Sequence, residues 1–126
     1  MTAFRLCFLI FCAGGCGALA RFGLTQAVGR FITSNYPLGT LVANVLGSYL
    51  FGVIWELAAV RMMLADATRV VLCVGFMGSF TTFSSLIFDS FALGQTRPLL
   101  LLVNIVLQVI LGFAALYGGI QTARLV

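Results

Sequence analysis

Glycine and hydroxyl residues interrupt an otherwise apolar stretch of the chain. The segment 75–85, Gly-Phe-Met-Gly-Ser-Phe-Thr-Thr-Phe-Ser-Ser, holds two glycines and five hydroxyl side chains. In hydrocarbon every backbone N–H and C=O must be satisfied, so such a segment persists at membrane depth only against protein, water or an ion. Interruptions of this kind commonly mark a permeation or binding site. Close packing of small residues between helices is the alternative explanation.

A second polar set lies in the preceding apolar stretch. Thr40, Asn44 and Ser48 are four residues apart, so they share one face of a helix. An asparagine facing lipid is costly, which predicts that this face points inward. An uncharged amide offers two N–H donors and suits an anion that must be released again. Asn44 as a hydrogen bond between helices is the other interpretation.

The composition identifies the elements that must position these residues. The 126 residues are 62% hydrophobic and 8% charged, with a mean hydropathy of +1.17, whereas soluble domains carry about 25% charged residues. Four apolar stretches, at about 4–28, 38–60, 70–93 and 99–123, are near or above the roughly 20 residues that cross a bilayer. We therefore expect an all-α integral membrane protein, a single domain over 1–126, with four transmembrane helices. The third should be broken near its middle, and no targeting segment is expected.

The charges exclude some functions and inform topology. Seven arginines are scattered singly, which argues against a nucleic-acid surface, and three acids without histidine argue against an enzyme. Four arginines fall on the side of the termini and two on the other: Arg5, Arg61, Arg69 and Arg124 against Arg30 and Arg97. This weak bias fits insertion in both orientations as well as termini that are both cytoplasmic. Four short helices bury too little to enclose an ion path, so a dimer is expected.

Three motifs carry a family resemblance. Gly17-Ala-Leu-Ala-Arg21, Gly39-Thr-Leu-Val-Ala-Asn44, and Gly75-x-x-Gly78 running into Thr81-Thr82-Phe83-Ser84 resemble the Fluc fluoride-channel family, also called CrcB. The resemblance implies a passive fluoride-selective channel that lowers cytoplasmic fluoride, located in the bacterial inner membrane. It further implies an antiparallel, dual-topology homodimer. A structural sodium ion, not transported, would lie at its centre on the backbone carbonyls of Gly78 and Thr81 from both subunits.

The expected fluoride pathway combines hydrogen-bond donors with ring edges. Fluoride is strongly hydrated, so its dehydration requires dense donors, which Asn44, Thr40, Ser84 and Ser85 can supply. The positive edge of the Phe83 ring could also face an anion. Asp89 is a functional candidate because acids are rare within membrane spans. Arg21 is expected to be structural, with its side chain reaching an interface.

The chain departs from the family pattern at several of these positions. Leu86 replaces the usual second phenylalanine, and Asp89 replaces a glutamate. The fourth span carries Asn104, Gln108 and then Gly112 where a stripe of hydroxyls is usual. These departures predict slow or retuned conduction, or a subunit that needs a different partner subunit in a heterodimer.

Two other functions fit a chain of this size. A small multidrug exporter needs an acid in its first helix, and none occurs before Glu56. A non-conducting membrane adaptor would use the same small residues only for packing. Trp55 and Glu56 are expected to be interface anchors, and Cys7, Cys12, Cys16 and Cys73 small buried hydrophobic residues rather than metal ligands.

Overall fold

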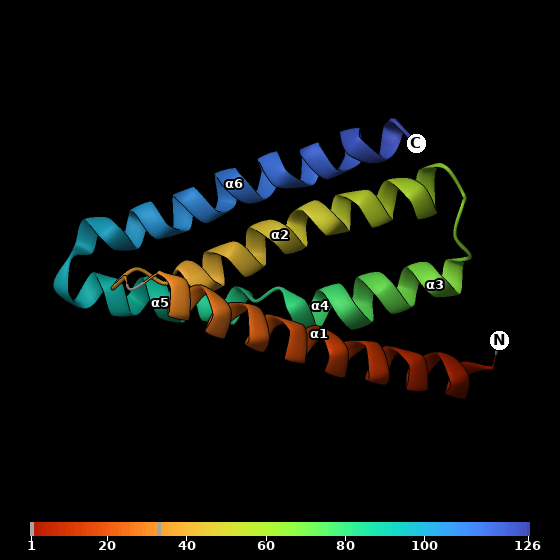
Figure 1. Ribbon diagram of the computed structural model, residues 1–126, viewed down its shortest axis with the longest axis horizontal. Helices are drawn as coiled ribbons and strands as arrows, with labels where there is room; N and C mark the ends of the chain where they lie inside the picture. Colours follow the sequence, from red (N-terminus) through yellow and green to blue (C-terminus); the bar gives the residue numbers. More distant parts are fainter. Residues whose placement is uncertain (1, 33) are drawn as a thin grey trace.

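The computed structural model describes residues 2–32 and 34–126, which form helices and short connections without any strand (Figure 1). Four helical spans are long and apolar enough to cross a membrane: Ala3–Phe31, Leu38–Val60, Asp66–Thr96 and Pro98–Arg124. The prediction of an all-α integral membrane protein with four such helices is confirmed. The first, third and fourth spans reach beyond the predicted apolar stretches, because residues at their ends, such as Gly29, Asp66 and Thr96, continue the helix.

The spans divide into the following elements. The first is α1 (Ala3–Phe31), and the second is α2 (Leu38–Trp55) continued by the π-helical turn η1 (Glu56–Val60). The third comprises α3 (Asp66–Val70), the π-helical η2 (Val71–Met77), α4 (Gly78–Phe80) and α5 (Phe83–Thr96). The fourth is α6 (Pro98–Arg124). Pro98 opens α6 at a position where its missing N–H has no intrahelical partner to lose. Both termini lie at the same end of the bundle (Figure 1).

Helices α2 and α6 make the most extensive contact in the fold. Two glycines allow their backbones to touch. A Cβ on Gly52 would collide with the Leu116 carbonyl, and one on Gly119 with the Tyr49 carbonyl. Small residues at such crossings are typical of membrane helix pairs. The α2–α6 pair is therefore a close backbone contact that fixes the position of every side chain between these two helices.

The third span is shared between two neighbours. Its first part, η2 and α4, packs on α1, whereas α5 packs on α6. Between these parts Thr81 (φ −82°, ψ 159°) and Thr82 (φ −149°, ψ 112°) are extended. The Thr82 hydroxyl accepts the Ser85 N–H at 3.2 Å and caps the start of α5. The polar segment at 81–82 thus separates two helical pieces with different partners.

The interior of the bundle mixes polar with apolar side chains, whereas its surface is mainly apolar. Its buried polar residues are Glu56, Ser90, Asn104 and Gln108, while many phenylalanine, leucine and valine side chains are exposed on the subunit surface. Such a distribution suits a protein whose surroundings are lipid or a second apolar surface.

Two sequence-based expectations about individual residues are wrong. Glu56 is 4% exposed and pairs with Arg124 (Nε to Oε1, 3.2 Å), so it is an internal ion pair rather than an interface anchor. Trp55 is exposed, as an anchor requires, with the Arg69 guanidinium over its ring. Cys7, Cys12 and Cys16 are exposed, because they lie on the outer face of α1, where a membrane protein places apolar side chains; only Cys73 is partly buried.

Candidate functional site

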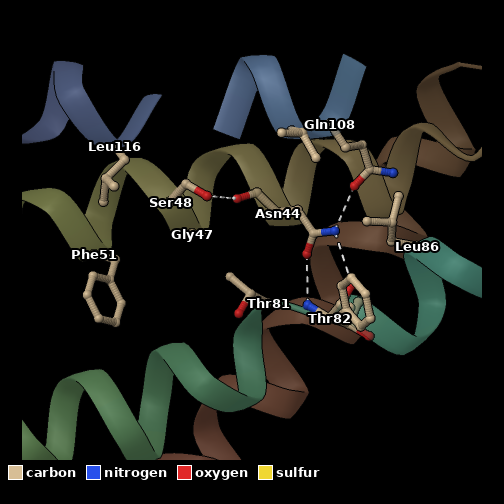
Figure 2. Close-up of a pocket in the computed structure, with 11 residues that line it drawn as sticks. Asn44, Gly47, Ser48, Phe51, Thr81, Thr82, Leu86, Gln108 and Leu116 are labelled. Carbon is tan, nitrogen blue, oxygen red and sulfur yellow. Dashed lines mark hydrogen bonds between the residues drawn. The ribbon is translucent and has the colours of Figure 1, made fainter. Parts of the chain in front are cut away.

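A pocket of about 350 Å³ lies between α2, α6 and the junction of α4 with α5 (Figure 2). None of the residues that line it is charged. They are Asn44, Gly47, Ser48, Phe51, Thr81, Thr82, Phe83, Leu86, Gln108, Val109 and Leu116. The pocket brings the two polar segments singled out in the sequence to one place, because α2 crosses the third span at the extended residues.

Asn44 and the backbone of Thr82 form a two-bond pair. The Thr82 N–H donates to Asn44 Oδ1 at 2.7 Å, and Asn44 Nδ2 donates to the Thr82 carbonyl at 3.1 Å (Figure 2). The Asn44 amide therefore replaces the backbone groups to which the Thr82 N–H and carbonyl would be hydrogen-bonded in a continuous helix. Gly47, one turn further along α2, makes room for this approach, since a Cβ there would collide with the Thr81 methyl group.

A chain of amides leads from Asn44 towards the connection before α2. Asn44 Nδ2 donates to Gln108 Oε1 at 2.7 Å, and Gln108 Nε2 donates to Asn104 Oδ1 at 3.2 Å. Asn104 Oδ1 also accepts the Tyr36 hydroxyl at 2.7 Å, and Asn104 Nδ2 donates to Ser90 Oγ at 2.8 Å. Burial raises the pKa of the Tyr36 phenol, which keeps it a neutral donor. We call these residues, Asn44, Gln108, Asn104, Ser90 and Tyr36, the amide chain.

The remaining predicted residues lie around this chain. Thr40 donates to Asp89 Oδ2 at 2.6 Å, which gives the acid within the span a hydroxyl partner. Asp89 also lines a second, wider hollow of about 890 Å³, shared with Tyr36, Arg97 and the end of α5. The hydroxyls of Ser84 and Ser85 contact the Thr82 hydroxyl at 3.3 and 3.0 Å.

Phe83 and Leu86, which occupy the positions of the two family phenylalanines, differ sharply in exposure. Phe83 is 75% exposed at the rim of the uncharged pocket, whereas Leu86 is 7% exposed. The Phe83 ring thus faces outward from the subunit, where a second subunit or lipid would contact it.

Arg21 lies against the third span. Its Nε donates to the Ser79 carbonyl at 3.2 Å, in the last turn before the extended residues. This contact supplies a partner to a carbonyl near a helix end. A structural role for Arg21 stays a prediction, now with a defined contact.

The carbonyls of Gly78 and Thr81 lose their helical partners. In a helix they would accept from the N–H groups of Thr82 and Ser85. Those N–H groups instead donate to Asn44 Oδ1 and to Thr82 Oγ1. Gly78 is also exposed on the subunit surface. Two oxygens are therefore available to a hard cation, and the residues fit a sodium ion.

Sequence reasoning missed three members of the site. Thr82, Tyr36 and Ser90 all take part in the hydrogen bonds above. A signal existed for Ser90, which lies four residues after Leu86 on one helical face. Tyr36 could not be placed, because it reaches the fourth span from the connection before α2.

These features define the class of the molecule: a small four-helix integral membrane protein with an uncharged polar site inside. Residues 8–120 match the family model described as CrcB-like protein, Camphor Resistance (CrcB). The chain is 49% identical over 115 residues to a fluoride-specific ion channel FluC of Solidesulfovibrio magneticus, covering 90% of this chain and 92% of the relative. It is 44% identical to one of Nitratidesulfovibrio vulgaris (strain Miyazaki F), covering 90% and 93%. The chain belongs to the CrcB family, also called Fluc.

Proposed function

We propose that the protein is a passive, fluoride-selective channel. The observation that carries this proposal is the convergence of uncharged amide side chains, Asn44 and Gln108, on a pocket at an interruption of a membrane-spanning helix. A fixed cation there would hold an anion too tightly for rapid release, whereas amides and hydroxyls replace water without trapping it. The relatives named fluoride-specific ion channels support fluoride as the ion.

The direction of net flow follows from the membrane potential. In an inside-negative membrane a single charge gains about 2.3 kcal/mol per 100 mV, which corresponds to a roughly fiftyfold concentration ratio. A passive anion channel in a bacterial inner membrane would therefore lower cytoplasmic fluoride without a coupled ion. No membrane-embedded acid for proton coupling is needed, and Asp89 would serve as a partner of Thr40.

An antiparallel, dual-topology homodimer is the proposed functional unit. One subunit leaves the site open on the side where Phe83 is exposed, so a partner surface is required to keep lipid out. The weak arginine bias supports two insertion orientations. In such a dimer the exposed Gly78 carbonyls of two subunits could approach one another.

A structural sodium ion at that contact is part of the proposal. The carbonyls of Gly78 and Thr81, freed from the helical pattern by Asn44 and Thr82, would hold it. Bound sodium would join the two subunits by coordination. The chain's own residues would then supply all contacts to fluoride.

Proteoliposomes test the channel directly. Purified protein is reconstituted with internal fluoride, and efflux is followed with a fluoride electrode after a potassium ionophore sets the potential. We expect fluoride efflux that needs no proton gradient, with chloride efflux at least a hundredfold slower. Equal fluoride and chloride efflux would refute selectivity, and an absence of efflux would favour the adaptor. Efflux that appears only with a second, different subunit would favour the heterodimer.

A further inference from the structure

Both amide hydrogens of Asn44 are already engaged in the subunit. One binds the Thr82 carbonyl at 3.1 Å and the other binds Gln108 Oε1 at 2.7 Å. An asparagine has only two such hydrogens. Since the pairing with Thr82 holds the extended segment in place, the hydrogen shared with Gln108 is the one that can turn to an anion.

Gln108 can reverse its polarity within the amide chain. Its Oε1 faces Asn44, and its Nε2 faces Asn104 Oδ1 at 3.2 Å. A half-turn of the Gln108 amide exchanges the two ends and presents N–H to Asn44. Asn104, Tyr36 and Ser90 can adjust, because an amide and a hydroxyl each both donate and accept. The bonds that join Gln108, Asn104 and Ser90 are then kept with their direction reversed, while the Ser90 hydroxyl gives up the bond that it now donates to the Leu86 carbonyl at 2.7 Å.

The reversed state is unfavourable without an anion and favourable with one. Two N–H groups that face each other across the present Asn44–Gln108 contact repel, and each loses an acceptor. An anion beside them, in the pocket that Asn44 and Gln108 both line, accepts from both. Gln108 is 4% exposed and Asn104 fully buried, so no bulk water compensates for a broken bond on this side of the chain.

We propose that Gln108 acts as a reversible latch on Asn44 and as a second donor to the anion. With the site empty, Gln108 presents its carbonyl and occupies the Asn44 donor. When a small, strongly hydrated anion enters, the Gln108 amide turns, and Asn44 and Gln108 each donate one N–H to it. This inference rests on the proposed function and adds to it a residue that sets the rate of entry.

Two substitutions of Gln108 distinguish its role in occupying the Asn44 amide from its role as a donor to the anion. In Gln108→Ser the hydroxyl is too short to reach Asn44 but still offers a donor. Fluoride flux should rise about two- to tenfold, the rate equivalent of one net hydrogen bond. In Gln108→Glu an ionised side chain binds Asn44 more strongly, cannot donate and repels the anion, so flux should fall more than tenfold. Gln26→Glu, on the exposed side of α1, is the matched control and should leave flux unchanged.

The decisive measurement observes the Gln108 amide itself. The full chain, labelled with ¹⁵N in glutamine side chains and reconstituted in bilayers with sodium, is titrated with fluoride or chloride by solid-state NMR. Gln108→Ser identifies the signal by its loss, and Gln26, Gln95 and Gln121 are internal references. We expect fluoride, and not chloride, to shift the Gln108 signal alone.

The outcomes separate the latch from the channel. Selective fluoride flux with a Gln108 signal indifferent to fluoride would overturn the latch and leave the channel standing. Flux that is equal in wild type, Gln108→Ser and Gln108→Glu would do the same. A fluoride-dependent Gln108 signal in a protein without flux would support the contact and overturn the channel.

Discussion

Removal of the Asn44 amide should disrupt the site more than any other single truncation. Asn44→Ala deletes three hydrogen bonds, two to Thr82 and one to Gln108. Each bond contributes about 0.5–1.5 kcal/mol, so the three together contribute about 1.5–4.5 kcal/mol. The Thr82 N–H and carbonyl would also lie in the bundle without partners, which favours a return of Thr82 to helical geometry.

That energy corresponds to a roughly ten- to two-thousandfold loss of the conformation in which Thr82 is extended. We expect fluoride efflux from liposomes to fall by the same order, with helical content retained in circular dichroism. Thr122→Ala is the control, because it too removes a side-chain bond to a backbone carbonyl, at an exposed position on α6. If Asn44→Ala conducted like Thr122→Ala, the assignment of Asn44 to both the site and the interruption would be refuted.

Three further predictions address the proposed sodium site at Gly78, the pocket position Leu86 and the Glu56–Arg124 ion pair. Gly78→Val should leave the subunit fold intact, since a Cβ at this position would meet only the Cys73 carbonyl oxygen, at 3.7 Å. The variant should nevertheless abolish the sodium-dependent dimers that crosslinking detects. Gly29→Val, at a position where a Cβ meets no atom within 4 Å, is the control and should keep these dimers. Dimers of Gly78→Val as stable as wild type in sodium-free buffer would contradict the sodium site. Leu86→Phe should raise fluoride flux up to about tenfold, because a ring edge attracts an anion; unchanged flux would show that position 86 does not contact the ion. Arg124→Ala leaves the Glu56 carboxylate buried without its cation and should lower thermal stability by about 1–3 kcal/mol without altering selectivity. A fluoride-to-chloride ratio altered by Arg124→Ala would contradict the separation of that ion pair from the pore.

The sequence predicts the spans and the polar segments well, since both depend on local patterns. Bilayer thickness imposes the length of each apolar stretch, and residues four apart must share a helical face. Asn44 and the 75–85 segment could therefore be singled out as inward-facing polar groups. Their contact could not be predicted, because it depends on the close crossing of α2 and the third span, where Gly47 leaves room for the Thr81 methyl group.

The errors have the same origin. Glu56 and Trp55 are neighbours in sequence, yet one turns into the bundle and the other away from it. Only the position of Arg124, at the far end of the chain, decides which of them is buried. The roles of Asn104 and Gln108 likewise depend on their hydrogen bonds to Tyr36 and Asn44, which belong to other elements.

The two extended residues between α4 and α5 have an electrostatic consequence. A helix carries about half a positive charge at its N-terminus and half a negative charge at its C-terminus. At Thr81 and Thr82 the C-terminus of the piece ending at Phe80 faces the N-terminus of α5. A single two-residue break in one span thus creates adjacent ends of opposite sign. The C-terminal end favours positive charge, which the Arg21 guanidinium already supplies at the Ser79 carbonyl, and the other end favours an anion near Phe83 and Ser84.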